Sequence, residues 1–291
     1  MRSITLKSPA KLNLYLRVQG KRRDGYHNLF TLFHRISLVD TLTLTKQAKG
    51  FSLRCSAPEL PVDDRNLVTR AYFLLKNKYP SLGGLRASLK KRIPLGAGLG
   101  GGSSNAAALL LGANRIYRLG LSRRSLLALG RRLGADVPFF LYETKHALAR
   151  GRGDLIQSKP CPGTLYFLLV LTNKGLSTKD VFCSPFLKAS GRSLTKNRHE
   201  VRMLSHFFRK KNYRKLAGFF RNDLESPAFC LRPEIRKQME VLTGAGFSSA
   251  RMSGSGPTLF ITFSSLKEVS RHRERVRRLF PKARLEIAHT F

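Results

Sequence analysis

The chain has 291 residues, which is long for one compact core and suits two domains. Its hydrophobic share of 42% excludes a disordered chain, and no apolar run reaches the roughly 18 residues that a membrane-spanning helix needs. The 54 basic and 17 acidic residues give a formal net charge of +37, which favours anionic substrates and polyanions as partners.

The N-terminal half is predicted to begin with strands and to continue with helices around a glycine-rich segment. Alternation of apolar and polar residues predicts the strands, and apolar residues three or four apart predict the helices. A charged turn is expected at Gly20–Tyr26. The predicted strands lie at residues 12–16, 40–45 and 85–93, and the predicted helices at 66–78, from the glycine-rich segment to about 117, and at 122–134.

The composition changes at Lys159–Gly163, which predicts a domain boundary there. The predicted domains are residues 1–158 and 159–291. In the second, strands are predicted at 165–171, 258–263 and 284–288, and helices at 198–216, 232–243 and 266–279. Two halves that each mix strands and helices, without internal repeats, indicate the α+β class.

The glycine-rich segment gives the least ambiguous chemical signal in the chain. Five of the seven residues from Gly96 to Gly102 are glycine, and the helix that follows begins with Ser103 and Ser104. Glycine lets successive backbone N–H groups point inward as an anion nest, and the helix adds the positive end of its dipole. The sequence therefore predicts a phosphate-binding loop at a helix start.

Several known phosphate loops do not fit this segment. It lacks the Gly-Lys-Ser/Thr ending of a Walker A loop, and no His-Arg-Asp sequence of protein kinases occurs. Gly96, Gly98 and Gly101 match the GxGxxG of dinucleotide-binding proteins. That motif also needs an acidic residue about 20 positions further on. The chain has none between Asp64 and Asp136, which disfavours this alternative.

Four further residues each have a functional and a structural interpretation. Asp136, between a helix-ending glycine and an apolar run, is either an N-cap or the acceptor of a substrate hydroxyl proton. Lys11, on one strand face with Asn13, is either a surface lysine or the stabiliser of a transferring phosphoryl group. Tyr26 and His27 either stack and hydrogen-bond a nucleobase or are an ordinary half-buried pair.

Three segments together resemble the GHMP kinase superfamily, the small-molecule kinases named after galactokinase and the homoserine, mevalonate and phosphomevalonate kinases. The segments occur in the family's order along the chain, and they are Ser8–Leu14, Pro94–Ser104 and Ser253–Thr258. The resemblance implies a two-domain α+β architecture. Its N-terminal domain would carry a βαβ ATP-binding unit, its C-terminal domain would be ferredoxin-like, and the active site would lie in the cleft between them.

Finer features are similar to the members of this superfamily that act on a cytidine diphosphate-linked methylerythritol. These features are Asp24–His27, Gly134–Pro138, Asp154 and Asn222–Glu225. Asp154 departs from the family's usual Glu, and the strong basic bias is a second departure. The resemblance implies an enzyme that transfers the γ-phosphoryl of ATP to the 2-hydroxyl of the erythritol part, in the non-mevalonate isoprenoid precursor pathway.

The resemblance also implies catalytic and ATP-binding residues. Asp136 resembles the residue that takes the proton from the substrate hydroxyl, and Lys11 the one that stabilises the phosphoryl group. ATP is expected as the co-substrate with Mg²⁺ on its phosphates, and no residue is assigned to a metal. The implied ATP-binding residues are Asn66, Pro94, Gly96, Ala97, Gly98, Leu99, Gly100, Gly101, Gly102, Ser103 and Ser104.

The implied substrate contacts centre on a cytosine ring. Tyr26 and Phe182 resemble the pair that sandwiches the ring, and His27 resembles the residue that binds its edge. Asn13 and Thr178 resemble further substrate contacts. This pattern favours a nucleobase-bearing substrate over mevalonate or homoserine.

The remaining features bear on location and on other partners. The N-terminus has no signal-peptide pattern, and the four cysteines form no CxxC pair, so we expect a cytoplasmic protein without a zinc cluster or redox motif. The basic residues are spread along the whole chain, whereas a nucleic-acid-binding protein more often concentrates them. Nucleic-acid binding stays a rival hypothesis. We expect no specific nucleic acid and no membrane partner.

Overall fold

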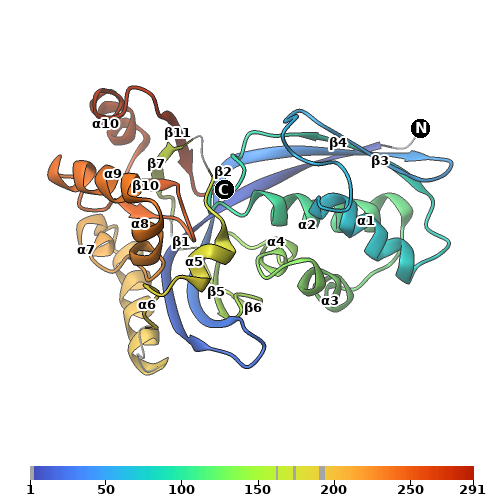
Figure 1. Ribbon diagram of the computed structural model, residues 1–291, viewed down its shortest axis with the longest axis horizontal. Coiled ribbons are helices and arrows are strands. Elements are labelled where there is room, and N and C mark those ends of the chain that lie inside the picture. Colours follow the sequence, from blue (N-terminus) through green and yellow to red (C-terminus); the bar gives the residue numbers. More distant parts are fainter. Residues whose placement is uncertain (1–2, 162, 173–174, 190–193) are drawn as a thin grey trace. The chain divides into compact units, whose positions relative to one another are not determined.

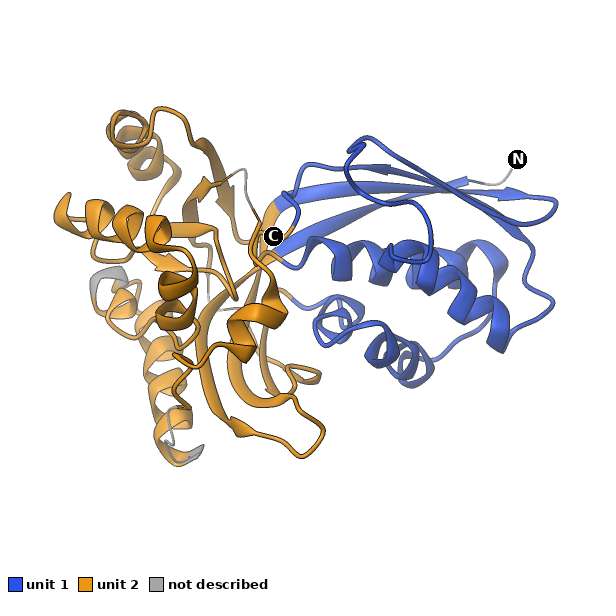
Figure 2. Ribbon diagram, viewed as in Figure 1, with its two compact units in different colours: residues 1–10, 38–95, 100–144 blue, residues 11–37, 96–99, 145–291 orange. Residues whose placement is uncertain are grey.

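The computed structural model describes residues 3–161, 163–172, 175–189 and 194–291 (Figure 1). The chain forms two compact units, the first of residues 1–10, 38–95 and 100–144, the second of residues 11–37, 96–99 and 145–291 (Figure 2). The long strands β1 (Ser3–Lys21) and β2 (His27–Gln47) contribute residues to both units. The units therefore do not follow the order of the chain, and the division after residue 158 stays a prediction.

The first unit contains a βαβ element. β3 (Phe51–Cys55) and β4 (Gly84–Lys90) pair in parallel, and α1 (Leu67–Lys78) connects them in the chain. β4 also pairs antiparallel with the last residues of β2. The other helices of the unit are α2 (Gly101–Tyr117), α3 (Arg123–Leu133) and α4 (Val137–Leu141). This confirms the predicted βαβ unit followed by the glycine-rich loop.

Close packing fixes α2 on the strands of this unit. A Cβ atom at Gly112 would lie 2.5 Å from Leu44 Cδ1 and 2.8 Å from Leu6 Cδ1, so only glycine fits there without a shift. Asn66 and Ser122 cap α1 and α3, as expected for these residue types. The two predicted helices thus begin where their capping residues indicate.

The second unit contains a four-stranded antiparallel sheet in the order β11-β7-β10-β9. These strands are β7 (Tyr166–Leu171), β9 (Arg251–Met252), β10 (Leu259–Phe263) and β11 (Arg284–His289). The main helices of this part are α9 (Pro233–Gly244), before β9, and α10 (Leu266–Leu279), between β10 and β11. The βαββαβ succession with this strand order confirms the ferredoxin-like prediction.

The second unit also holds further strands and helices. β5 (His146–Gly151) pairs antiparallel with β2 and with β6 (Leu155–Ser158), and β8 (Arg221–Asn222) pairs in parallel with β1. The helices are α5 (Thr178–Cys183), α6 (Leu194–Arg209), α7 (Tyr213–Ala217) and α8 (Glu225–Leu231). Within the described part of the chain, every helix is too short or too polar to cross a membrane.

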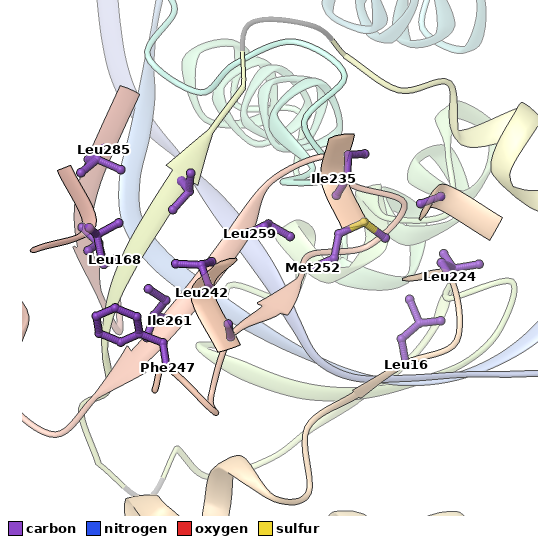
Figure 3. Packing of buried hydrophobic residues seen from close by; sticks show 14 of the residues in the cluster. Leu16, Leu168, Leu224, Ile235, Leu242, Phe247, Met252, Leu259, Ile261 and Leu285 are labelled. Atoms are coloured by element: carbon purple, nitrogen blue, oxygen red, sulfur yellow. The ribbon is translucent and has the colours of Figure 1, made fainter. Parts of the chain in front are cut away.

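Alternating residues of the sheet form the core of the second unit. Leu168 of β7 and Ile261 of β10 pack with Ile235 and Leu242 of α9 (Figure 3). Val269 and Val276 of α10 belong to the same cluster, so both helices cover one face of the sheet. The helix predicted at residues 266–279 is thereby confirmed, and its buried apolar residues make it amphipathic.

Two buried histidines lie between the first strands of the second unit and the C-terminal strand. His34 of β2 is paired with His146 of β5, and their Nδ1 atoms are 3.1 Å apart. His34 Nε2 lies 2.9 Å from Thr290 Oγ1. Burial lowers the pKa of His146 to about 4, and burial together with the neighbouring His146 lowers the pKa of His34 well below its usual value. Both rings are therefore neutral, with one Nδ1 donating and the other accepting.

We expect the protein to lose stability as the pH falls from about 6.5 toward 4. The unfolded histidines take up protons near pH 6.5 while the folded ones resist protonation, so the unfolded state binds more protons in this window. The loss from His146 alone is on the order of 3 kcal/mol, from a pKa of about 4 in the folded state. Urea unfolding at a series of pH values measures it.

His146→Gln should flatten this pH dependence, whereas replacing the exposed His199 by Gln should leave it as in the wild type. A His146→Gln profile as steep as that of the wild type would contradict the expectation.

Candidate active site

The glycine-rich loop has the backbone conformation that the sequence predicts. Gly96, Gly98 and Gly100 have φ values of +58°, +72° and +70°, in the left-handed region that side chains other than glycine rarely adopt. Gly100 is the N-cap of α2, has no side chain to cap the helix, and is followed by a first turn without acidic residues. The backbone N–H groups and the positive dipole end at this helix start suit an anionic ligand.

A buried carboxylate in the first unit fixes the start of this loop. Asp40 Oδ1 accepts hydrogen bonds from the backbone N–H groups of Arg92 (2.7 Å) and Ile93 (2.9 Å). Its Oδ2 accepts one from Asn105 Nδ2 on α2 (3.0 Å) and forms an ion pair with Lys91. Because residues 91–93 turn toward Asp40, β4 ends at Lys90 and not at Ile93 as predicted. Sequence analysis did not identify Asp40 as functional.

Other candidate residues of the first unit are placed as follows. The carboxamide of Asn66 accepts from Val68 N (2.9 Å) and donates to the carbonyl of Pro61 (2.7 Å), so it caps α1. The Ser104 hydroxyl is buried without a hydrogen-bond partner within the described residues. Asp136 stands at the N-cap position of α4, yet its side chain accepts no capping hydrogen bond. The structure therefore does not support the interpretation of Asp136 as a side-chain cap of α4.

In the second unit, Lys11 and Asn13 share one face of β1. Both side chains are buried, with 4% and 2% of their surface exposed. Lys11 Nζ donates to Asn13 Oδ1 (2.6 Å) and lies 5.2 Å from the ring centroid of Phe33. Asn13 Nδ2 in turn donates to Thr31 Oγ1 (2.8 Å). The surface-lysine alternative for Lys11 is thus wrong, because its ammonium is held inside the unit.

Two glycine-rich segments meet beside this lysine. A Cβ atom at Gly98 would lie only 2.1 Å from the carbonyl oxygen of Ser253, and Ser253 Oγ donates to the carbonyl of Gly98 (3.1 Å). A Cβ atom at Gly254 would lie 3.2 Å from both Lys11 Nζ and Asn13 Oδ1. The segment Ser253–Thr258, by itself only a turn signal, therefore lines the surroundings of Lys11.

The loop also contacts the segment that leads into α5. Leu176 N donates to the carbonyl of Gly96 (3.1 Å), and the Thr178 and Ser255 hydroxyl oxygens are 2.9 Å apart. Hydrogen bonds thus join the start of α5 to the glycine-rich loop and to the segment Ser253–Thr258 within the second unit.

The aromatic candidates also belong to the second unit. His27 stacks on Phe182 of α5, with ring centroids 5.5 Å apart and an interplanar angle of 28°. Tyr26 is 55% exposed, and the Arg152 guanidinium carbon lies 4.9 Å from its ring centroid. Within the described residues, the rings of Tyr26 and Phe182 do not contact each other. Burial, and secondarily the charge of Lys21, lowers the pKa of His27, which keeps the ring neutral at pH 7.

The structure thus groups the candidate residues by unit. The second unit holds Lys11, Asn13, Tyr26, His27, Gly96, Ala97, Gly98, Leu99, Thr178 and Phe182. The first unit holds Asn66, Pro94, Gly100, Gly101, Gly102, Ser103, Ser104 and Asp136. The first unit supplies the anion-binding start of α2, and the second unit supplies the buried ammonium of Lys11.

The chain belongs to the GHMP kinase family. The model of the GHMP kinases N terminal domain matches residues 66–144, and the model of the GHMP kinases C terminal domain matches residues 206–282. The protein is therefore a small-molecule kinase that uses ATP.

Among its relatives is the 4-diphosphocytidyl-2-C-methyl-D-erythritol kinase of Desulfotalea psychrophila, 40% identical over 89% of this chain and 85% of the relative. The kinase of the same name from Polynucleobacter necessarius is 36% identical over 92% and 86% of the two chains. A crystal structure of 4-(cytidine 5'-diphospho)-2C-methyl-D-erythritol kinase matches with a TM-score of 0.81 and 32% identity over 98% of both chains. Homoserine kinase from Cytophaga hutchinsonii, at 19% identity and a TM-score of 0.76, shares the fold.

Replacing Asp40 by Ala is expected to destabilise the protein and to weaken ATP binding. The substitution leaves the ammonium of Lys91, 6% exposed, without its buried partner, which costs about 3–5 kcal/mol. It also frees the backbone of residues 92 and 93 at the loop entrance. Urea unfolding and the KM for ATP measure the two effects.

Asp63→Ala is the matched control, because it removes an exposed ion pair with Arg65 whose partners are 50% and 73% exposed. Equal unfolding midpoints and ATP KM values for the two variants would show that Asp40 does not anchor the loop.

Proposed function

We propose that the protein transfers the γ-phosphoryl group of ATP to the 2-hydroxyl of 4-diphosphocytidyl-2-C-methyl-D-erythritol, in the non-mevalonate route to isoprenoid precursors. The observation that carries the proposal is the buried Lys11–Asn13 pair beside two glycine-rich segments, in a unit that also presents the stacked His27 and Phe182. The names of the relatives support the substrate. A cytoplasmic location and the absence of a specific nucleic-acid or membrane partner belong to the same proposal.

The backbone of the loop and the start of α2 bind the phosphates of ATP in this proposal. Left-handed glycines turn the N–H groups toward the anion, and the positive dipole end of α2 adds to their attraction. Asn66 belongs to the adenine side of the site in this proposal, where its carboxamide holds the start of α1. The remaining ATP contacts are those of Pro94, Gly96, Ala97, Gly98, Leu99, Gly100, Gly101, Gly102, Ser103 and Ser104.

Mg²⁺ accompanies the nucleotide. Within the described residues, no three His, Cys, Asp or Glu side chains form a group that could hold a metal ion by themselves. Mg²⁺ needs no such group, because it takes most of its ligands from phosphates and water. The Ser104 hydroxyl lies in the first turn of α2 and has no hydrogen-bond partner among the described residues, so it fits as one protein ligand. When bound, the ion neutralises charge on the phosphates.

Two residues perform the chemical step in this proposal. The Asp136 carboxylate accepts the proton of the 2-hydroxyl, whose oxygen forms a bond to the γ-phosphorus as the bond to the β–γ bridging oxygen breaks. ADP leaves with the electron pair of that bond. The Lys11 ammonium offsets the negative charge on the transferring group, and its bond to Asn13 fixes its position. Asn13 and Thr178 contact the acceptor substrate.

Cytosine recognition falls to the aromatic residues. A neutral His27 has one donor and one acceptor, which matches the mixed donor and acceptor groups on the edge of cytosine. Tyr26 and Phe182 sandwich the ring. His27 stacks on one face of Phe182 in this structure, so the cytosine ring either uses the other face of Phe182 or takes the place of His27.

Asp136→Asn is expected to lower kcat by about 10²–10⁴-fold, the usual contribution of a general base, with little change in the KM for ATP. A coupled assay of ADP release with the cytidyl substrate measures this. Near-equal rates for wild type and variant would remove Asp136 from the mechanism. Turnover of mevalonate or homoserine without turnover of the cytidyl substrate would refute the proposed substrate.

Charge reversal at Lys210 and Lys211 serves as the control in the same assay, because both side chains lie on exposed surface. We expect these variants to keep wild-type turnover. A wild type without kinase turnover that binds nucleic acid, with binding kept in Asp136→Asn and lost in the charge reversals, would instead favour the nucleic-acid-binding hypothesis.

Tyr26→Ala is expected to raise the KM for the cytidyl substrate about 5- to 150-fold, since stacking of one base on an aromatic ring contributes about 1–3 kcal/mol. Tyr26→Phe keeps the ring and should keep the KM. The KM for ATP should stay constant in both variants. An unchanged KM for the cytidyl substrate in Tyr26→Ala would exclude this residue from the sandwich.

A further inference from the structure

The segment Asn222–Glu225 has no role in the mechanism described so far. It begins on β8, which pairs with β1 at Tyr15 and Leu16. All of its contacts discussed below lie within the second unit. They connect β1, which carries Lys11 and Asn13, with the glycine-rich segment Ser253–Thr258.

The Asn222 carboxamide holds that segment directly. Its Nδ2 donates one hydrogen bond to the carbonyl of Met252 and one to the carbonyl of Gly254, both at 2.8 Å. Its Oδ1 accepts from Leu224 N (3.0 Å), and only 8% of the residue is exposed. Both donors of the side chain are therefore committed to the backbone on either side of Ser253, an arrangement that a carboxylate of the same shape cannot make.

The two residues that follow strengthen the same connection. Glu225 Oε1 accepts from Met252 N (2.9 Å), so Met252 is held through both its N–H and its carbonyl. Asp223 accepts from Val18 N (2.9 Å) and from Arg17 Nη1 (2.6 Å), which ties the segment to β1. Leu16, Leu224 and Met252 meet in the hydrophobic core beneath (Figure 3).

Gly254 is the point at which this clamp approaches the reacting groups. Its carbonyl is bound by Asn222, and its Cα hydrogens face Lys11 Nζ and Asn13 Oδ1, where a Cβ atom would lie 3.2 Å from each. Its φ of +57° costs a glycine no strain, so the hydrogen bonds to the neighbouring backbone determine where it lies. A displacement of Gly254 therefore changes the space in which the Lys11 ammonium is held.

We infer that Asn222 is a positioning residue for phosphoryl transfer, which acts by holding Gly254 against the Lys11–Asn13 pair. The inference rests on the proposed function in that Lys11 stabilises the transferring group. Asn222 touches neither ATP nor the acceptor in this account. Its loss should lower kcat far more than it raises the KM for ATP. Gly98 of the phosphate loop contacts the same segment through Ser253, but Asp40 holds the loop entrance and α2 independently of Asn222.

The test is Asn222→Asp, which keeps the volume and the Oδ1 acceptor but replaces both donors by an oxygen that faces two carbonyls. We expect kcat per folded enzyme to fall about 100-fold, the effect of a misplacement near 1 Å at a reacting group, with the KM for ATP within about twofold of the wild type. Asn222→Ala, which adds no charge, and Gly254→Ala, which leaves Asn222 intact, should show the same loss of kcat and carry the test if Asn222→Asp fails to fold.

A double-mutant cycle separates positioning from simple destabilisation. In a Lys11→Ala background, or in Asn13→Ala if the first has no measurable turnover, Asn222→Asp should lower kcat only a few-fold further. If Asn222→Asp lowered kcat by the same factor in the wild type and in the Lys11→Ala or Asn13→Ala variant, the inference would be overturned, because a purely structural role does not depend on the Lys11–Asn13 pair. Wild-type kcat in Asn222→Asp would overturn it as well.

Asn114→Asp is the matched control, since Asn114 also clamps a turn, through hydrogen bonds to Leu121 N (3.0 Å) and the Leu121 carbonyl (3.2 Å). It should lose stability and keep kcat; a comparable loss of kcat there would overturn the inference. The wild-type enzyme in the same assay decides the proposed function separately. If the wild type turns over another alcohol instead of the cytidyl substrate, the cycle is measured with that alcohol.

Discussion

Gly98 and Gly254 bring two stretches of backbone so close together that the atoms of one occupy the space of a side chain on the other. At Gly98 a methyl group would overlap the carbonyl oxygen of Ser253. This contact constrains the backbone course of both segments, and the side chains around it are arranged to fit. The backbone N–H of Lys11 is bound to the carbonyl of Leu99, so the strand that carries the ammonium is fixed to the same loop.

The chain anchors this arrangement with buried polar groups more than with its abundant surface charge. Asp40 binds the entrance of the loop in the first unit, and Asn222 binds the segment Ser253–Thr258 in the second. Each satisfies several backbone groups at once, which a flexible surface ion pair cannot do at comparable energy. The excess of basic residues therefore bears on the approach of anionic ligands, while a few carboxylates and amides determine local geometry.

Much of the fold follows from local sequence signals, namely helix-capping residues and the spacing of apolar residues. Ser122 caps α3 and Asn66 caps α1. In α10, the apolar residues face the sheet. Other features depend on contacts between distant residues and leave no such pattern. α5 is too short to show a period, and Asp40 looks like any polar residue of an alternating strand until its partners at 91–93 and 105 are known. The family's glycine motifs located the loop, but the stacking of His27 on Phe182 required the fold.

The division of the chain into units has a consequence for its synthesis on the ribosome. The residues of the first unit all lie before residue 145, whereas the second combines residues 11–37 with residues up to 291. His34, for instance, bonds Thr290, 256 positions further along. Residues 11–37 thus pair first with β5 and later with partners more than 200 positions away, and closing so large a loop is slow. During synthesis, the Lys11 side chain therefore meets Asn13 and Phe33 early and gains its contact with Gly254 only after that residue has been added.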